Sequence, residues 1–295
     1  MLVLDHHTFT TLSPANLGNT DAARAGLPGT RLFTADEAGV LVDSTVVVGE
    51  TSAMVVDTQF TRASAVALAD LITATGRRLD TIFVTHHHPD HLFGLSILLD
   101  RFPEARAIAH PAVLRAMESA AKPTFDRMIG SVPRGVFPEK LALPEAMRGN
   151  YFTFEGERVD VLDPMRGDTA LITPVHIKAL DTLIVADIAY TDTHLWLEEN
   201  TKPEQIDAWR ASIAAIEAVG ASTIIPGHRK PESVSDRSVL DFTRNYLARW
   251  EKAIGSSRSA EELKQALVTG QESLGFGFAL SRSVASIYPT GEAHH

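Results

Sequence analysis

The sequence predicts an α/β fold in which strands and helices alternate. Short runs rich in β-branched residues recur along the chain, and segments of helical periodicity separate them. The chain has 295 residues, of which 44% are hydrophobic and 22% charged, values typical of a globular protein with a substantial core. Because strand–helix–strand alternation is typical of layered α/β domains, we expect residues 1–295 to form a single domain of this class.

In the first part of the chain, the order of elements can be predicted from local patterns. Residues 1–30 are mixed and rich in Gly, Pro and Asn, which predicts an irregular lead-in. Apolar residues recur at i, i+3, i+4 and i+7 from Ala65, and Gly76 follows where a helix is expected to stop. We expect strands at 40–42, 45–48, 53–56, 81–84 and 105–109, and helices at 65–72 and 92–102.

The second part of the chain begins with an insertion and ends in helices. Residues 111–150 open with a helix at 111–122 and continue with several Pro and Gly residues. This insertion is interpreted as a lid, a helical interface or a small additional core, and these alternatives stay open. We expect strands at 151–154, 158–162, 170–175, 182–186 and 223–225, and helices at 206–219, 239–254, 260–268 and 279–287. The last three helices form a C-terminal extension, residues 232–290, which packs on the flank or mediates a homodimer.

Composition excludes several classes of protein. The formal net charge of −10 argues against nucleic-acid binding, which needs a basic surface. No cysteine occurs, so disulfide scaffolds, cysteine nucleophiles and thiolate metal sites are excluded. Residues 1–14 lack the pattern of a secretory signal, and no apolar run is long enough to span a bilayer. We therefore expect a cytoplasmic protein without a membrane partner.

A dense cluster of histidines follows the strand predicted at 81–84. The segment Thr-His-His-His-Pro-Asp-His contains His86, His88, Asp90 and His91. The loop after a buried strand can direct several side chains at one point, which is where sites on α/β sheets tend to lie. His86 and His88 are two residues apart and would project to the same side of an extended segment. Imidazole nitrogens and carboxylate oxygens are good ligands for Zn²⁺ and related divalent ions, so the segment predicts a metal site.

This segment resembles the signature of the metallo-β-lactamase-fold hydrolases, His-x-His-x-Asp-His, and later positions match the same pattern. Asp187, after a strand, resembles the bridging carboxylate of that family, and His228 resembles its last histidine ligand in a Pro-Gly-His context. The resemblance runs from about residue 39 to residue 228. It implies an αββα four-layer sandwich, a dinuclear metal site and hydrolase activity.

Two positions depart from the family pattern. Gln59 stands where the family's Asp-Thr-Gly turn has its glycine, after Asp57, a residue that could hold the ligand loop through hydrogen bonds. Asp168 stands where the family has its third histidine. We interpret Asp168 as a ligand, because some relatives carry a carboxylate there; the alternative is a mononuclear or decayed site. A carboxylate in place of an imidazole is a harder ligand, so the site would tolerate Mn²⁺ or Fe as well as Zn²⁺.

The resemblance implies a ligand set for two divalent metal ions, most simply Zn²⁺, with Mn²⁺ or Fe as alternatives. The first ion would be bound by His86, His88 and Asp168, the second by Asp90, His91 and His228, with Asp187 between the two ions. Two such ions lower the pKa of bound water from about 15.7 toward 7 and so supply hydroxide at neutral pH. Asp90 is the expected catalytic residue, because it could orient this nucleophile and transfer a proton to the leaving group.

Tyr190, three residues after Asp187, gives an indication of the substrate class. A tyrosine at this spacing resembles the acyl-homoserine lactonases, where it assists at the substrate oxygen, and a phenol can stabilise an oxyanion. We therefore expect hydrolysis of an ester or lactone of a small molecule. The alternatives are β-lactam, thioester or phosphate- and sulfate-ester hydrolysis, an oxygen-using iron enzyme, and a catalytically silent ligand-binding protein.

Overall fold

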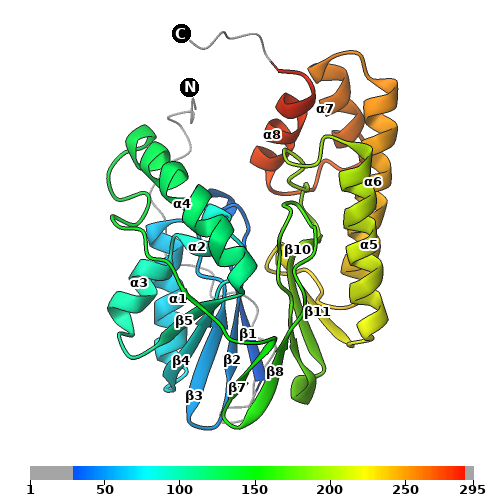
Figure 1. Cartoon of the computed structure of the whole chain (residues 1–295). Helices are drawn as coiled ribbons and strands as arrows, with labels where there is room; N and C mark the ends of the chain where they lie inside the picture. Colours follow the sequence, from blue (N-terminus) through cyan, green and yellow to red (C-terminus); the bar gives the residue numbers. More distant parts are fainter. Residues whose placement is uncertain (1–28, 290–295) are drawn as a thin grey trace. The chain divides into compact units, whose positions relative to one another are not determined.

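The computed structural model describes residues 29–289 and divides the chain into two compact units, Met1–Arg158 and Val159–His295. The predicted lead-in therefore lies almost entirely outside the described residues. Both units combine strands with helices, which confirms the α/β class (Figure 1). Among residues 29–289, no helix is long and apolar enough to cross a membrane. That a single domain spans the chain stays a prediction.

The first unit contains a six-stranded sheet in the order β1-β2-β3-β4-β5-β6. The pairs β1–β2 and β2–β3 are antiparallel, and the pairs from β3 to β6 are parallel. Every residue of β2 and β3 is buried, as expected for strands covered on both faces. The strands are β1 Gly29–Thr34, β2 Asp43–Val48, β3 Ser52–Val56, β4 Arg78–Phe83, β5 Arg106–Ala109 and β6 Glu145–Ala146.

Four α-helices accompany this sheet: α1 Arg62–Ala74, α2 Pro89–Leu92, α3 Leu95–Arg101 and α4 Pro111–Ser131. Helix α1 starts at a capping box in which Thr61 and Ser64 exchange hydrogen bonds, and it buries the apolar positions that predicted it. Helices α1 and α3 pack on each other (Figure 1). Helix α4 carries Phe125, which packs with Phe93 and Phe137 in an aromatic cluster.

The second unit contains most of a five-stranded sheet in the order β11-β10-β9-β8-β7. Strands β10 and β11 are parallel, and helices α5 and α6 pack on β10 (Figure 1). Trp209 on α5 and Trp250 on α6 are both fully buried. Strand β7, Tyr151–Phe154, belongs to the first unit, and β8, Glu157–Val161, begins in it. The other elements are β9 Val175–Ile177, β10 Thr182–Tyr190, α5 Pro203–Val219, β11 Thr223–His228, α6 Ser238–Ser256, α7 Ala260–Val268 and α8 Gly277–Ile287.

The turn of the β7–β8 hairpin also fixes a neighbouring loop. Glu155 and Gly156 both have positive φ, as a two-residue hairpin turn requires. The Glu155 carboxylate accepts hydrogen bonds from the backbone N–H groups of Glu50, Thr51 and Ser52, at 2.6–2.7 Å. Burial raises the pKa of Glu155, but these hydrogen bonds outweigh it and lower the pKa to about 2. The β2–β3 turn is thus held by a charge-assisted contact.

Some local predictions are wrong for identifiable reasons. Residues 40–42 are not a strand, because a 3-10 turn at Glu37–Gly39 leads into Val40 and Leu41, both at positive φ. Residues 170–175 do not form a strand either: only an isolated bridge at Ile172 and the first residue of β9 pair there, and Pro174 cannot donate to a ladder.

Two predicted helices have different bounds. The helix expected at 92–102 is interrupted at Gly94, where an added Cβ would lie 1.8 Å from the carbonyl oxygen of Thr58. Helix α4 runs past Pro123 to Ser131, well beyond the predicted 111–122. Packing of Phe125 into the aromatic cluster outweighs the hydrogen bond that Pro123 removes.

Candidate metal centre

In the first unit, the predicted ligands follow two neighbouring parallel strands. Asp57 comes directly after β3, and His86 comes shortly after β4. Because β3 and β4 are parallel, their carboxyl ends meet at the same edge of the sheet. Helix α2 then begins with Pro89 at its first position, which turns the chain so that Asp90 and His91 follow His88 on a short helix.

Asp57 fixes the orientation of His91. One Asp57 oxygen accepts the Thr85 backbone N–H at 2.8 Å, and the other accepts the Thr85 hydroxyl and pairs with His91 Nδ1, each at 2.8 Å. All three residues are buried. Because a carboxylate only accepts, His91 carries its proton on Nδ1 and presents the lone pair of Nε2 as a ligand. Asp57 therefore holds the ligand loop, as the sequence suggested.

His86 is oriented by the same network. Its Nδ1 lies 3.0 Å from the Thr85 hydroxyl oxygen. Since the only hydroxyl proton of Thr85 is donated to Asp57, the oxygen accepts from Nδ1, and His86 also presents Nε2. The His86 ring centroid is 4.1 Å from that of His91 and 4.9 Å from that of His88. Ligand atoms of His86 and His88 lie within 4.8 Å of each other, as do those of Asp90 and His91. We call His86, His88, Asp90 and His91 the first half-site.

In the second unit, Asp187 and His228 come from the adjacent parallel strands β10 and β11. A register shift at Ala186, which has φ 45°, re-aims β10 just before Asp187. His228 Nε2 lies 3.2 Å from an Asp187 oxygen. Between them, Gly227 permits the approach, because an added Cβ would lie 1.7 Å from Asp187 Oδ1. The Pro-Gly-His context thus has a steric reason.

Asp168 lies in a tight turn against β10. Its backbone N–H donates to the Asp187 carbonyl oxygen at 3.2 Å, and Gly167 fits only because it lacks a Cβ, which would lie 2.4 Å from that same oxygen. Carboxylate atoms of Asp168 and Asp187 lie within 4.8 Å of each other. The structure thus brings together Asp168, Asp187 and His228, which we call the second half-site.

Tyr190 contacts all three members of the second half-site. Its hydroxyl lies 3.0 Å from a carboxylate oxygen of Asp168 and 3.0 Å from one of Asp187. Its ring stacks on the His228 ring at 4.9 Å, and Phe276 stacks on His228 at 4.6 Å. The Tyr190 side chain is fully buried. Its expected role at a substrate oxygen stays a prediction.

Several positioning residues were not predicted from sequence. The Thr85 hydroxyl donates to Asp57 and accepts from His86. Phe276 stacks on His228. The Thr243 hydroxyl accepts from the Tyr190 backbone N–H at 2.9 Å. Thr85 precedes the histidine segment directly, so its position was a usable signal. Thr243 and Phe276 lie far along the chain on the C-terminal helical segment, and no local pattern indicates them.

Gln59, the departure from the family's Asp-Thr-Gly turn, adopts the glycine-like conformation. Its φ is 81°, in the left-handed region that favours glycine. The buried side-chain amide donates to the Ser44 hydroxyl at 2.8 Å and reaches the carbonyl oxygens of Phe33 and Val42 at 3.4 and 3.3 Å. These contacts offset the backbone strain and anchor the turn to β1 and to the start of β2.

The segment between β10 and α5 contains a histidine whose pKa is strongly lowered. His194 Nδ1 lies 2.8 Å from the Tyr246 hydroxyl. Burial, together with the nearby positive charge of Arg249, lowers the pKa of His194 to about 4. Burial also raises the pKa of Tyr246. Both groups are therefore neutral at pH 7 and belong to the packing of α6.

The donor set is chemically suited to divalent metal ions. It consists of four imidazoles and three carboxylates, which are ligands for Zn²⁺, Mn²⁺ and Fe²⁺. The orientation of His86 and His91 by Thr85 and Asp57 is the arrangement that holds imidazole ligands in metal sites. Each half-site therefore fits metal ligation by its own chemistry.

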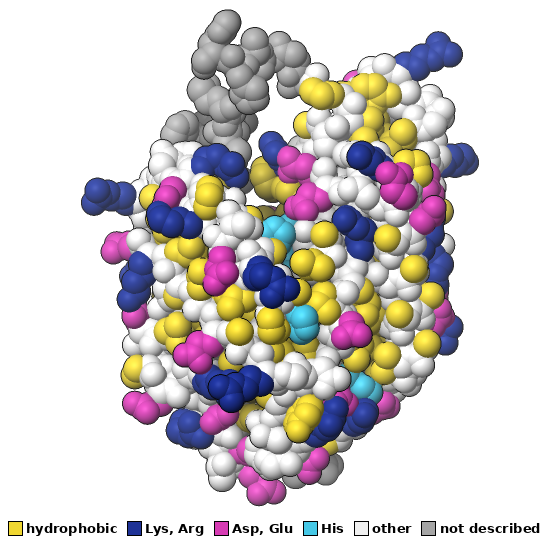
Figure 2. All heavy atoms as spheres, in the orientation of Figure 1, with side chains coloured by type: hydrophobic (Ala, Val, Ile, Leu, Met, Phe, Trp, Pro, Cys, Tyr) yellow, Lys and Arg dark blue, Asp and Glu magenta, His cyan; other side chains and the backbone are white. Residues whose placement is uncertain are grey.

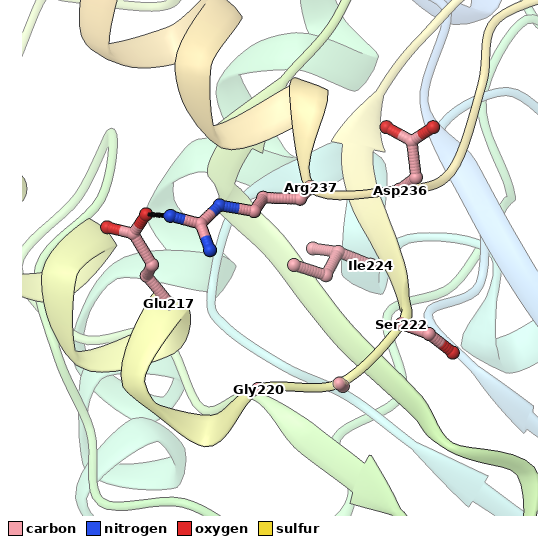
Figure 3. A pocket seen from close by; sticks show the side chains of 7 residues that line it. Glu217, Gly220, Ser222, Ile224, Asp236 and Arg237 are labelled. Carbon is pink, nitrogen blue, oxygen red and sulfur yellow. Dashed lines mark hydrogen bonds and ion pairs between the residues drawn. The ribbon is translucent and has the colours of Figure 1, made fainter.

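The second unit also carries a surface hollow whose lining includes none of the candidate ligands. A hollow of about 460 Å³ lies at the opposite end of β11 from His228, and there Arg237 is paired with Glu217 (Figure 3). A second carboxylate contact of Glu217, to Arg244, leaves its charge compensated. On the face drawn in Figure 2, Lys and Arg side chains are interspersed with Asp and Glu side chains rather than gathered in one patch.

Comparisons with known proteins identify a family and a fold. The family model described as the metallo-beta-lactamase superfamily matches residues 38–228. No curated protein matches the sequence. Solved structures that resemble the chain confirm the predicted fold: each has the metallo-β-lactamase fold.

Three of these structures illustrate the likeness. A metallo-beta-lactamase family protein from Thermus thermophilus is 20% identical, with a TM-score of 0.60, over 88% of this chain and 92% of that one. A metallo-beta-lactamase from Pontibacter korlensis is 19% identical, with a TM-score of 0.54, over 75% and 94%. The DIM-1 metallo-beta-lactamase exposed to ceftazidime is 21% identical, with a TM-score of 0.53, over 70% and 84%.

Proposed function

Since the chain belongs to the metallo-beta-lactamase superfamily, whose members are mostly metal-dependent hydrolases, we propose that it hydrolyses an ester or lactone of a small molecule. The observation that carries this proposal is the pair of half-sites. Each one gathers side chains that could hold a metal ion, close to the ends of strands and within residues 38–228, the range that the superfamily model matches.

We propose that the two half-sites bind two divalent ions jointly. His86, His88 and Asp168 would hold one ion, Asp90, His91 and His228 the other, and Asp187 both. The mixed nitrogen and oxygen donors favour Zn²⁺, and the carboxylate of Asp168 in place of an imidazole extends the choice to Mn²⁺ and Fe²⁺. The contact of the Asp168 turn with Asp187 supports Asp168 as a ligand.

When bound, the metal ions would supply a water molecule of lowered pKa and polarise the carbonyl of the substrate. The chain's own residues would do the rest. Asp90 would orient the attacking water, accept its proton and transfer it to the leaving alkoxide oxygen. Asp57 would keep the His91 ring in place by accepting from Nδ1.

Tyr190 would act at the substrate oxygen. Its hydroxyl lies beside Asp168 and Asp187, so it is positioned at the second half-site. A phenol has one proton to donate. To donate it to a developing oxyanion, Tyr190 would have to give up its hydrogen bonds to Asp168 and Asp187. The tyrosine is the feature that favours an ester or lactone over the other substrates of this fold.

A chelator experiment tests the proposal. The purified protein is assayed on a panel of lactones, carboxylate esters, a thioester, a β-lactam and a phosphate diester, before and after removal and restoration of Zn²⁺, Mn²⁺ or Fe²⁺. We expect hydrolysis of a lactone or ester that chelation abolishes and metal restores. Turnover of the β-lactam or phosphate diester alone would replace the substrate class, and no turnover at all would favour a ligand-binding protein.

A further inference from the structure

Asn200 connects the segment after β10 with the turn that carries Asp168. The side chain is fully buried. Its Nδ2 group donates to the Gly167 carbonyl oxygen at 3.2 Å and to the Asp168 carbonyl oxygen at 2.6 Å. Its Oδ1 accepts from Arg166 Nη1 at 3.1 Å. A single amide thus bonds three consecutive residues, 166–168.

The surroundings of the Asn200 amide allow only one orientation. The nitrogen faces two carbonyl oxygens, which can only accept, and the oxygen faces a guanidinium group, which can only donate. Exchanging the two ends would place oxygen against oxygen and N–H against N–H. Both N–H groups of the amide therefore donate to carbonyl oxygens of the turn that carries Asp168.

The bonds from Asn200 complete the fixation of the Asp168 backbone. On one side, the Asp168 N–H donates to the Asp187 carbonyl oxygen at 3.2 Å. On the other side, its carbonyl oxygen accepts from Asn200. Close by, the Thr169 hydroxyl donates to the Glu199 carboxylate at 2.7 Å, so the neighbouring residue of the same segment also holds the turn.

We propose that Asn200 is a positioning residue that aims the Asp168 carboxylate at the metal ion, compensating for the loss of the imidazole usual at this position. This rests on the proposed function, in which Asp168 is a ligand. A carboxylate on a short turn has more rotational freedom than an imidazole held through its second nitrogen, so the backbone beneath it must be rigid. Groups that orient a ligand in this way typically contribute about 10–100-fold to metal affinity.

The test compares metal binding of the wild type, Asn200→Ala, Asn200→Asp and Ser283→Ala. Ser283 is the matched control: it is buried, accepts from the Leu197 backbone N–H at 2.8 Å and holds the same segment without bonding residues 166–168. Asn200→Asp keeps the shape and the acceptor for Arg166 but removes both donors. Zn²⁺ content is measured after dialysis, Co²⁺ binding is followed by visible absorption, and thermal unfolding monitors the fold.

We expect the wild type to bind two ions, and both Asn200 variants to bind one of them about 10–100-fold more weakly while retaining the other. Ser283→Ala should unfold at a lower temperature with metal affinity unchanged. If Asn200→Asp binds both ions as the wild type does, or if Ser283→Ala weakens one ion equally, the role of Asn200 is refuted while the proposed function stands. If the wild type binds no ion, both proposals fail.

Discussion

The first half-site takes all four candidate ligands from one short segment after β4, whereas the second takes its three candidate ligands from a turn and two strands. In the first, Asp57 and Thr85 orient two imidazoles through a compact hydrogen-bond network. In the second, hydrogen bonds from Tyr190 and Asn200 are combined with close backbone approach at Gly167 and Gly227 and with aromatic stacking around His228. The same ligand chemistry is therefore built locally in one unit and by long-range packing in the other.

This difference predicts how each half-site responds to substitution. A hydrogen-bond network can be broken one bond at a time, so changes in the first half-site should affect binding or turnover more than folding. Close packing transmits strain through a dense interior, so changes in the second half-site should affect stability and metal binding together.

The largest effect is expected for Asp90→Asn in the first half-site. The amide cannot accept a proton from the attacking water, so kcat should fall by roughly 10²–10⁴-fold, with little change in the unfolding temperature. The control is Asp100→Asn, an exposed carboxylate paired with Lys140, where little change is expected. Steady-state kinetics on the best substrate of the panel measures both variants, and an unchanged kcat for Asp90→Asn would refute its catalytic role.

Asp57→Asn should have the next largest effect. If the amide nitrogen took the place of the oxygen that faces the Thr85 backbone N–H, two donors would meet, so the nitrogen should turn toward His91 Nδ1. His91 Nδ1 then has to accept, and the proton of the ring moves to Nε2. We expect metal affinity to fall by about 10–100-fold. Competition with a chromophoric chelator measures this affinity, and wild-type affinity in the variant would show that Asp57 only terminates β3.

The same contrast explains what could be predicted from sequence. The first half-site was predictable because His86, His88, Asp90 and His91 are adjacent in sequence and follow a recognisable strand. Asp168, Asp187 and His228 were found only through the resemblance to a family, since each is isolated in the sequence. Asn200, Thr243 and Phe276 were not predicted, because their roles depend on three-dimensional packing that leaves no local pattern.

The fold shows the same limit. Elements with strong periodicity, such as the helix around Ala65–Ile72, were predicted correctly, because their own apolar faces specify them. The strand predicted at 40–42 failed because β-branched composition there is overridden by a turn at positive φ. The end of α4 was missed because tertiary packing of Phe125 carries the helix through Pro123.

Gly227→Ala tests the packing of the second half-site. The new Cβ would meet Asp187 Oδ1 and the backbone of Ala186, so β10 or the carboxylate must move. We expect a loss of about 1–3 kcal/mol in the free energy of unfolding, together with weaker metal binding. Gly255→Ala on α6 is the matched control: its Cβ meets nothing within 4 Å, so it should be stabilising by about 0.5–1 kcal/mol. Urea unfolding measures both, and equal stability of the two variants would contradict the steric argument.

The smallest effects are expected for the pH dependence of folding stability, where one group in each unit titrates in its own pH range. In the second unit, the pKa of His194 is lowered from 6.5 to about 4, so the unfolded chain binds a proton at this residue before the folded chain does. Protonation of His194 therefore costs the folded state no stability above pH 6.5, and the folded state loses stability as the pH falls from 6.5 to about 4. In the first unit, the pKa of Glu155 is lowered from 4.5 to about 2. Its contribution is complete above pH 4.5 and is lost as the pH falls toward 2.

Two variants separate these pH windows. His194→Asn removes the titrating group beside Tyr246, so the stability of this variant should change less than that of the wild type between pH 6.5 and 4. Glu155→Gln removes the carboxylate that accepts from residues 50–52, so this variant should be less stable than the wild type above pH 4.5, and the gap should close as the pH falls toward 2. Urea unfolding at a series of pH values, with metal removed by chelator, measures both. If His194→Asn retains the full wild-type slope between pH 6.5 and 4, the acid sensitivity in that window arises from other groups, and the packing around α6 does not carry it.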